Sequence, residues 1–202
     1  MKHILIDGTT ISRHIDGLTQ YILNVVLRLD VSNTRYTLLI RPGECPSNYL
    51  KLIEEKGIGV EEVNIAPIGP LRDIQFARYL RMHKGFDAAF VPSNQFPLAL
   101  KFPSVYVIHD LIYEQFPEQL GRFSRLKRWY LRLVVYIGLR KAKKVVAVSN
   151  YTREEIMRCY GKRFADKIQV IYEGWEHLLN NSTSSQIRPK GLDFGEYILY
   201  VG

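Results

Sequence analysis

SVYVIHDLIYEQFPE, residues 104–118, joins a short apolar run to a polar pair, His109 and Asp110. The run at residues 105–108 is continuous and β-rich, which is typical of a strand buried on both faces of an α/β sheet. Ligands of open α/β sheets bind outside the carboxyl ends of the strands, where this pair is expected to lie. A histidine there can exchange hydrogen bonds with a substrate. The pair can equally serve only to cap the strand and bind loop amides.

The rest of the chain alternates strand-like runs with helical periodicities. The expected strands are residues 2–7, 35–40, 59–64, 86–92, 105–108, 144–149 and 167–172. The expected helices are residues 17–29, 47–56, 71–82, 124–141 and 152–160. Asp16 can cap the first helix, and a capping box of Thr152 and Glu155 can open the last. This alternation predicts an α/β fold with a Rossmann-like, mostly parallel sheet and helices on both faces.

Length and composition suit a globular protein of the cytoplasm. A chain of 202 residues fits one large domain or slightly more, and 47% hydrophobic residues can form an ordinary core. The two cysteines, Cys45 and Cys159, lie far apart without metal-ligand spacing, which suits a reducing compartment. No apolar run has membrane-spanning length, and the opening MKHILIDG resembles a strand more than a signal peptide.

The net charge of +8 is concentrated in one stretch. Between Gln119 and Arg153 there are ten basic residues and no acidic one, so the rest of the chain is slightly acidic. The ten are Arg122, Arg125, Lys127, Arg128, Arg132, Arg140, Lys141, Lys143, Lys144 and Arg153. No nucleic-acid recognition motif accompanies them, and we expect no nucleic-acid partner. A solvated cationic face and an anionic membrane surface remain as the two interpretations.

The helix expected at residues 124–141 carries much of this charge. Helical spacing places Leu126, Tyr130, Leu133 and Ile137 on one side. Arg125, Arg128 and Arg132 lie on another side, and we expect these three to dock on an anionic membrane surface. Phe123, Trp129 and Tyr130 beside the cations suit such an interface. This arrangement predicts a cytoplasmic protein that is peripheral to the inner face of a membrane.

Several kinds of cofactor chemistry are not expected. A dinucleotide-binding turn needs closely spaced glycines after the first strand, whereas Gly8 and Gly17 are far apart. No Walker-type phosphate loop occurs. His109 and Asp110 follow a strand without the further ligands that a metal-dependent hydrolase needs, and the remaining histidines lack ligand spacing. We therefore expect neither a metal nor a bound organic cofactor.

Four motifs taken together carry a resemblance to a known family. In chain order they are HDLIYEQFPE, VVAVSNYTREEI, YEGWEH and EYILYVG. Their order and separations resemble the N-terminal half of a group 1 retaining glycosyltransferase of the GT-B fold. Such enzymes join two Rossmann-like domains across a cleft, and the N-terminal half mainly holds the acceptor while the C-terminal half binds the nucleotide sugar.

The resemblance implies a division of the chain. Residues 1–180 would form the acceptor-binding domain, and residues 181–202 would be a linker and the first strand of the donor-binding domain. The family's phosphate-binding Arg and Lys, and its paired glutamates, would lie beyond Gly202, so we expect this chain alone to be inactive. The strand expected at residues 197–201 lacks its own sheet and would favour self-association.

The resemblance also assigns roles to individual residues. His109 would lie beside the transferred sugar, and Asp110 would orient the loop or the acceptor. The loop before residues 17–29 would face the donor phosphates, where Gly17 offers free amides at a helix start; a plain helix-start residue is the alternative. Asn94 and Glu118 are candidate acceptor contacts, and Glu118 can equally be a solvated loop acid.

The predicted function is therefore the N-terminal part of a glycosyltransferase. It would act with retention, moving a sugar from a nucleotide-sugar donor to a glycan or lipid-linked acceptor. The alternative is a non-catalytic basic module that binds a membrane or a glycan. Ligand binding separates the two, because an acceptor domain should recognise a glycan, whereas a basic module should respond only to charge and salt.

Overall fold

A computed structural model describes residues 1–121 and 123–174 of the chain. Its contacts divide the chain into two units, Met1–Tyr172 and Glu173–Gly202. The sheet and its helices belong to the first unit. The predicted domain boundary at residue 180, and the linker and strand expected within residues 181–202, lie outside the described residues.

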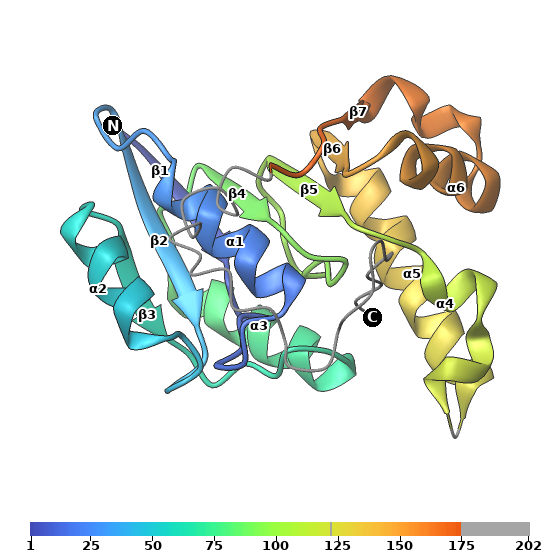
Figure 1. Cartoon of the computed structure of the whole chain (residues 1–202), viewed down its shortest axis with the longest axis horizontal. Helices are drawn as coiled ribbons and strands as arrows, with labels where there is room; N and C mark the ends of the chain where they lie inside the picture. Colours follow the sequence, from blue (N-terminus) through green and yellow to red (C-terminus); the bar gives the residue numbers. More distant parts are fainter. Residues whose placement is uncertain (122, 175–202) are drawn as a thin grey trace, which may run out of the picture. The chain divides into compact units, whose positions relative to one another are not determined.

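The first unit is built on a parallel sheet (Figure 1). Among the described residues its order is β3-β2-β1-β4-β5-β6-β7, and every neighbouring pair is parallel. The strands are β1 (Lys2–Asp7), β2 (Thr34–Ile40), β3 (Gly59–Glu62), β4 (Ala88–Val91), β5 (Ser104–Ile108), β6 (Lys144–Ala147) and β7 (Ile168–Val170). The predicted Rossmann-like α/β fold is confirmed.

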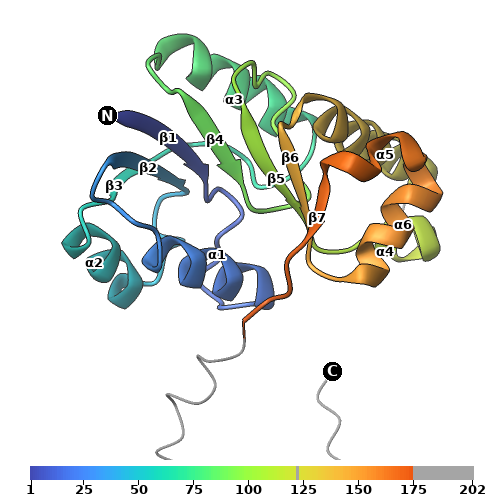
Figure 2. The same ribbon diagram turned by 90° about the horizontal axis from the view of Figure 1, so that it is seen from above.

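Helices cover both faces of this sheet. The α-helices are α1 (Gly17–Leu27), α2 (Ser47–Glu55), α3 (Pro70–Met82), α4 (Ile112–Gln115), α5 (Ser124–Lys141) and α6 (Asn150–Tyr160). Short 3₁₀ helices follow α4 and α6, namely η1 (Pro117–Leu120) and η2 (Lys162–Lys167). Figure 2 shows α1 and α2 on one face and α3, α5 and α6 on the other. Right-handed crossovers explain this division, because the chain first moves outward from β1 to β3 and then in the opposite direction from β4 to β7.

The sheet separates two hydrophobic cores, one on each face, and successive residues of a strand point alternately into one core and the other. Ile6 and Leu38 face α1 and α2, whereas their neighbours Leu5 and Leu39 face α3, α5 and α6. All four side chains are at most 1% exposed. Strands buried on both faces explain why their sequences are apolar runs and not alternating patterns.

The caps of two helices differ in how well the sequence predicts them. At α1, the Asp16 carboxylate accepts a hydrogen bond from the Thr19 amide at 2.7 Å, which confirms the expected cap. At α6, the prediction of a capping box that begins at Thr152 is wrong. Ser149 is the N-cap and accepts from the Thr152 amide at 3.0 Å, so the helix begins at Asn150. The strand before it ends early enough for Ser149 to turn its hydroxyl onto the helix.

Helix α5 faces the core with residues other than the four that helical spacing groups on its apolar side. Its buried residues are Val134, Val135, Gly138 and Leu139. Leu126, which helical spacing groups with Tyr130, Leu133 and Ile137, is 67% exposed. The glycine is required, because a Cβ at Gly138 would lie 2.7 Å from the Tyr106 ring of β5. This close approach fixes the rotation of α5 and turns Leu126 toward solvent.

The order of the strands also places a candidate site. The sequence of connections changes direction between β1 and β4, which makes this point of the sheet a topological switch point. The carboxyl ends of β1, β4, β5 and β6 lead into the loops that carry Gly8, Asn94, His109 and Ser149 respectively. The polar side chains of Asn94, His109 and Ser149 therefore lie in loops at the edge where open α/β sheets bind their ligands.

Candidate functional site

His109 is the first residue after β5, and the surrounding backbone fixes its ring. Its Nε2 lies 2.9 Å from the carbonyl oxygen of Pro92, in the loop after β4. Because a carbonyl oxygen only accepts, Nε2 is the donor of this hydrogen bond. The Tyr21 ring of α1 meets the imidazole edge-on, with the ring centroids 4.8 Å apart. The imidazole is thus oriented from both sides of the switch point.

The main chain of His109 is held as firmly as its ring. Its amide donates to Asn94 Oδ1 at 3.0 Å, and its carbonyl oxygen accepts from Thr152 Oγ1 at 2.9 Å. These bonds come from the loop after β4 and from α6, so three elements converge on one residue. Such multiple support is what a side chain needs if it is to keep one geometry toward a ligand.

Asn94, the candidate acceptor contact, uses both ends of its amide on the backbone. Its Oδ1 accepts from His109, and its Nδ2 donates to the Asp110 carbonyl oxygen at 2.9 Å. Its own carbonyl oxygen accepts from the Tyr106 hydroxyl at 2.8 Å. The structure gives Asn94 the role of a clamp between two loops, while contact with an acceptor stays a prediction.

The two predicted acids near His109 lie on exposed backbone. Asp110 accepts a hydrogen bond from the Ile112 amide at 3.2 Å and so supports the start of α4. Glu118 lies in η1 and is exposed. Asp110 thus hydrogen-bonds the backbone of its own loop, and its catalytic role and any contact of either side chain with a sugar stay predictions.

Packing requires a glycine at position 8 of the first loop but not at position 17. A Cβ at Gly8 would lie 2.7 Å from the Leu39 carbonyl oxygen, so only glycine fits there. A Cβ at Gly17 would meet nothing within 4 Å. Packing does not explain Gly17, and its expected role at the donor phosphates stays a prediction. The steric role of Gly8 depends on β2, which sequence spacing does not show.

A buried ion pair joins helix α3 to the end of strand β1, next to the switch point. Asp7, the last residue of β1, pairs with Arg72 of α3, and each residue is 1% exposed. The other oxygen of Asp7 accepts from the Thr9 hydroxyl at 2.7 Å. The Arg72 guanidinium lies 5.1 Å from the centre of the Phe76 ring. The pair joins α3 to the end of β1, and sequence reasoning missed it because its members are 65 positions apart.

Two of the three predicted membrane-docking arginines contact one carboxylate, that of Glu114. Arg128 contacts Glu114 Oε2 through Nε at 3.1 Å and Nη2 at 2.9 Å, and Arg132 Nε lies 3.2 Å from Oε1. The Glu114 side chain is 2% exposed, whereas Arg125 is exposed. Part of the positive charge of the basic stretch is therefore balanced by the carboxylate of Glu114, which lies on α4 just before this stretch. Docking by Arg125, Arg128 and Arg132 stays a prediction.

Two tyrosines extend the Glu114 cluster toward α6. The hydroxyls of Tyr113 and Tyr160 lie 2.7 Å apart, and Tyr160 donates to Glu114 at 3.4 Å. Burial is the main reason that the pKa of each tyrosine is raised, so both hydroxyls stay protonated. The cluster links α4, which follows His109 directly, to α5 and α6.

A cluster of metal-ligating side chains, a reactive thiol or a membrane-spanning helix in the described part of the chain would each indicate a different kind of function. No group of three or more His, Cys, Asp or Glu side chains there could hold a metal ion. Burial raises the pKa of Cys45 to about 11 and raises that of Cys159, so neither thiol is activated as a nucleophile. Across residues 1–121 and 123–174, every helix is too short or too polar to cross a bilayer.

Comparison with known proteins identifies the family. No curated protein matches this chain. The family model described as Glycosyltransferase Family 4 matches residues 15–176. This span includes the start of α1, the clamped His109 and the Glu114 cluster, and it covers most of the sequence. Together with the parallel α/β sheet, this match shows that the chain belongs to Glycosyltransferase Family 4.

Proposed function

We propose that the chain forms the acceptor-side, N-terminal half of a retaining glycosyltransferase that uses a nucleotide sugar. The observation that carries this proposal is the support of His109 at the switch point. Its ring and main chain accept or donate hydrogen bonds to Pro92, Asn94 and Thr152. A strand cap alone would not need its imidazole oriented from two sides. A fixed imidazole is suited to hydrogen-bond a sugar and to steady charge that develops during transfer.

The start of α1 is the proposed contact for the donor phosphates. The Asp16 cap already uses the amide of Thr19 through its side chain and that of Gln20 through its carbonyl oxygen. The amides of Gly17 and Leu18 are left to face an anion. The positive end of the helix dipole favours a phosphate there, whereas the Asp16 carboxylate opposes it. This end of the helix can therefore provide only part of the donor's binding energy.

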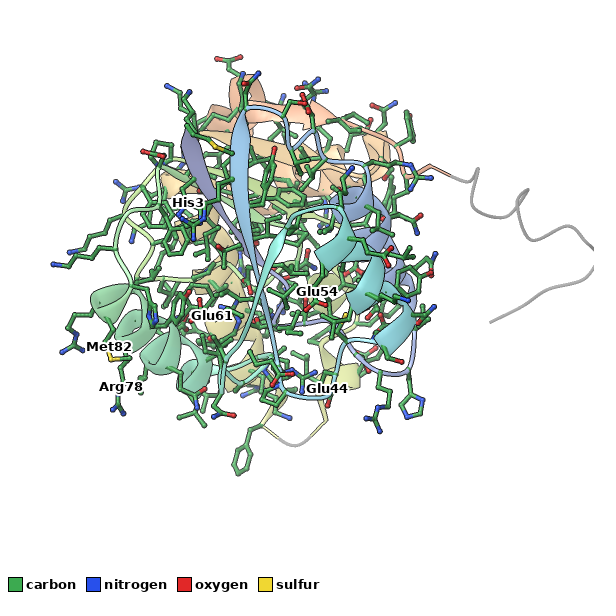
Figure 3. All side chains as sticks on the ribbon, turned by 90° about the vertical axis from the view of Figure 1, so that its left-hand side faces the viewer. His3, Glu44, Glu54, Glu61, Arg78 and Met82 are labelled. Carbon is green, nitrogen blue, oxygen red and sulfur yellow. The ribbon has the colours of Figure 1, made fainter. Side chains whose placement is uncertain are left out.

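The acceptor would extend along the same edge of the sheet. A cavity of about 390 Å³ lies where β2 and β3 end, and its polar lining includes Arg41, Glu44, Asn64 and Gln75. Figure 3 shows Glu44 at the opposite end of the strands from His3, which lies in β1 near the start of the sheet. Amide, carboxylate and guanidinium groups can all hydrogen-bond sugar hydroxyls. We propose that glycan or lipid-linked acceptors reach toward this cavity, with Asp110 and Glu118 nearer the reacting sugar.

Saturation-transfer NMR tests the proposed function, because it detects ligands that bind weakly. The chain is mixed with uridine and guanosine diphosphate sugars and with oligosaccharide acceptors. We expect saturation of the sugar protons by the wild type and its loss in His109→Ala, with the variant still folded by circular dichroism. His83→Ala, which alters an exposed histidine elsewhere, is the matched control. A basic module would instead show binding that follows only ligand charge and disappears with salt, and that result would refute the proposal.

A further inference from the structure

The outward side of α5 is apolar over its first turns. Leu126 and Trp129 are 67% and 63% exposed, and Leu133 and Tyr136 continue the same stripe half-buried. Their spacing of three, four and three residues places all four on one side of a helix. A surface helix normally turns polar residues outward and apolar residues toward the core. The opposite side of α5 already packs on the sheet, so this stripe is a second apolar surface.

Two further rings enlarge this surface near the start of α5. Phe123, the N-cap residue, is 67% exposed, and Phe116, at the end of α4, is 45% exposed. Both segments lie together at one end of the unit (Figure 1). Contiguous exposed apolar side chains of this kind mark an interaction site more often than an accident of packing.

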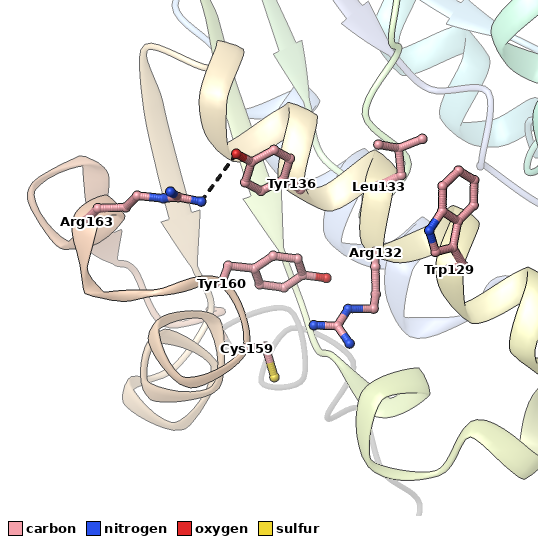
Figure 4. A pocket seen from close by; sticks show the side chains of 7 residues that line it. All are labelled: Trp129, Arg132, Leu133, Tyr136, Cys159, Tyr160 and Arg163. Carbon is pink, nitrogen blue, oxygen red and sulfur yellow. Dashed lines mark hydrogen bonds between the residues drawn. The ribbon is translucent and has the colours of Figure 1, made fainter.

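The stripe leads into a groove between α5 and α6 (Figure 4). The groove has a volume of about 450 Å³. Its walls include the rings of Trp129, Tyr136 and Tyr160, and its cationic groups are Arg132 and Arg163. The groove therefore combines an apolar wall with two positive charges, and it lies outside the edge of the sheet that holds His109.

Neighbouring side chains orient both arginines, but they occupy only some of the N–H donors of each guanidinium group. Arg132 contacts Glu114 through Nε at 3.2 Å, and its side chain is 46% exposed. Arg163 donates to the Tyr136 hydroxyl at 3.3 Å, and its guanidinium lies 5.4 Å and 5.0 Å from the centres of the Tyr136 and Phe164 rings. A guanidinium has five N–H donors, so each group keeps donors for an anion. Arg128 differs, because two of its nitrogens contact Glu114.

We propose that this surface seats on an anionic phospholipid bilayer. A lipid phosphate lies between Arg132 and Arg163 in the groove, and Leu126 and Trp129 enter the boundary between headgroups and acyl chains. Charge complementarity selects this occupant, because the side chains that line the groove include Arg132 and Arg163 and no carboxylate. A second copy of the chain would bring like charges together. A free phosphate would leave the apolar stripe uncovered. The proposal is independent of the proposed transferase function and replaces Arg128 by Arg163 among the docking residues.

Vesicle binding with a single tryptophan probe tests this site. Trp175→Phe leaves Trp129 as the only tryptophan of the chain. With phosphatidylglycerol-containing vesicles we expect a blue shift of its emission and quenching by brominated acyl chains, and with neutral phosphatidylcholine neither effect. Arg132→Gln with Arg163→Gln should weaken binding roughly thirtyfold, from about 1 kcal/mol for each basic residue near the surface. Arg163→Gln alone leaves Glu114 paired and should still weaken binding severalfold. The double variant Leu126→Gln with Trp129→Gln should lose most of its vesicle binding. Because this variant lacks the tryptophan probe, its binding is measured by sedimentation with the vesicles.

Helix α3 offers matched controls. Arg78→Gln with Arg81→Gln removes the same charge, and Leu71→Gln with Ile74→Gln removes exposed apolar side chains of similar kind. Neither control should change vesicle binding. Equal losses in the α3 variants would overturn the proposal, as would binding to neutral vesicles or an unshifted Trp129. Displacement by inorganic phosphate at constant ionic strength would reassign the groove to a soluble anion. A lipid-free dimer lost in the Leu126 and Trp129 variant would reassign the stripe to self-association.

Discussion

Glu114→Gln is expected to destabilise the protein and to loosen the elements beside His109. The wild-type carboxylate is buried and faces two arginines, Arg128 and Arg132. Glutamine keeps the size of the side chain but removes the charge, and its amide nitrogen turns a donor toward cations. Both guanidinium groups then lose their charged acceptor.

The magnitude follows from burial and exposure. Removing one partner of a fully buried ion pair costs about 3–5 kcal/mol. Here the Glu114 side chain is 2% exposed, but those of Arg128 and Arg132 are 36% and 46% exposed, so water can solvate them after the change. Solvent screening reduces the loss. We expect the free energy of unfolding to fall by about 2 kcal/mol, which corresponds to a Tm lower by about 4–8 °C for a protein of this size.

Urea unfolding followed by circular dichroism measures this change, and Glu154→Gln is the control. Glu154 is an exposed carboxylate on α6, and its replacement should alter the free energy of unfolding by less than about 0.5 kcal/mol. A cycle that combines Glu114→Gln with Arg128→Gln should show strong coupling, because the two side chains are in contact. Equal stability of Glu114→Gln and the wild type, or additive effects in the cycle, would refute the account of this cluster.

Three further changes test other parts of the structure. Gly8→Ala should lower the free energy of unfolding by about 1–3 kcal/mol, because its Cβ would lie 2.7 Å from the Leu39 carbonyl oxygen, whereas Gly17→Ala should leave it nearly unchanged by calorimetry. Asp16→Asn keeps a good N-cap but removes a negative charge, so titration calorimetry should show tighter binding of a nucleoside diphosphate sugar; weaker binding would place the phosphates elsewhere. Burial lowers the pKa of His3 below 6.5, so the unfolded chain binds more protons and stability falls as pH drops through that value. His3→Gln should flatten this dependence in urea titrations, and an unchanged slope would assign it to other groups.

The sequence predicts the scaffold better than the contacts that support its site. Apolar runs and helical periodicity locate the sheet because strands buried on both faces need continuous apolar residues. The position of His109 follows from the strand before it. Asn94 could be noticed as a polar loop residue, but its two bonds to backbone depend on β4 and β5 being neighbours. The Asp7 and Arg72 pair depends on the crossover between β3 and β4, which local patterns do not specify.

Helix α5 shows a second limit. Apolar residues occur around most of its circumference, so periodicity alone cannot choose the side that faces the sheet. The choice is made by Gly138, which allows close contact with β5, and by Glu114, which draws Arg128 and Arg132 toward α4. Both are tertiary effects that join residues far apart in the chain. The same effects turn Leu126 outward and create the surface proposed above.

The most direct test of the central claim is the imidazole NMR spectrum of the chain during addition of a nucleotide sugar. The sequence has five histidines, and His109→Gln identifies the resonances of His109. The account predicts that nucleoside diphosphate sugars shift the His109 ring signals in a saturable way, while those of His3 and His83 stay in place. Saturable binding that leaves the His109 signals unmoved would contradict the claim that this ring faces the transferred sugar.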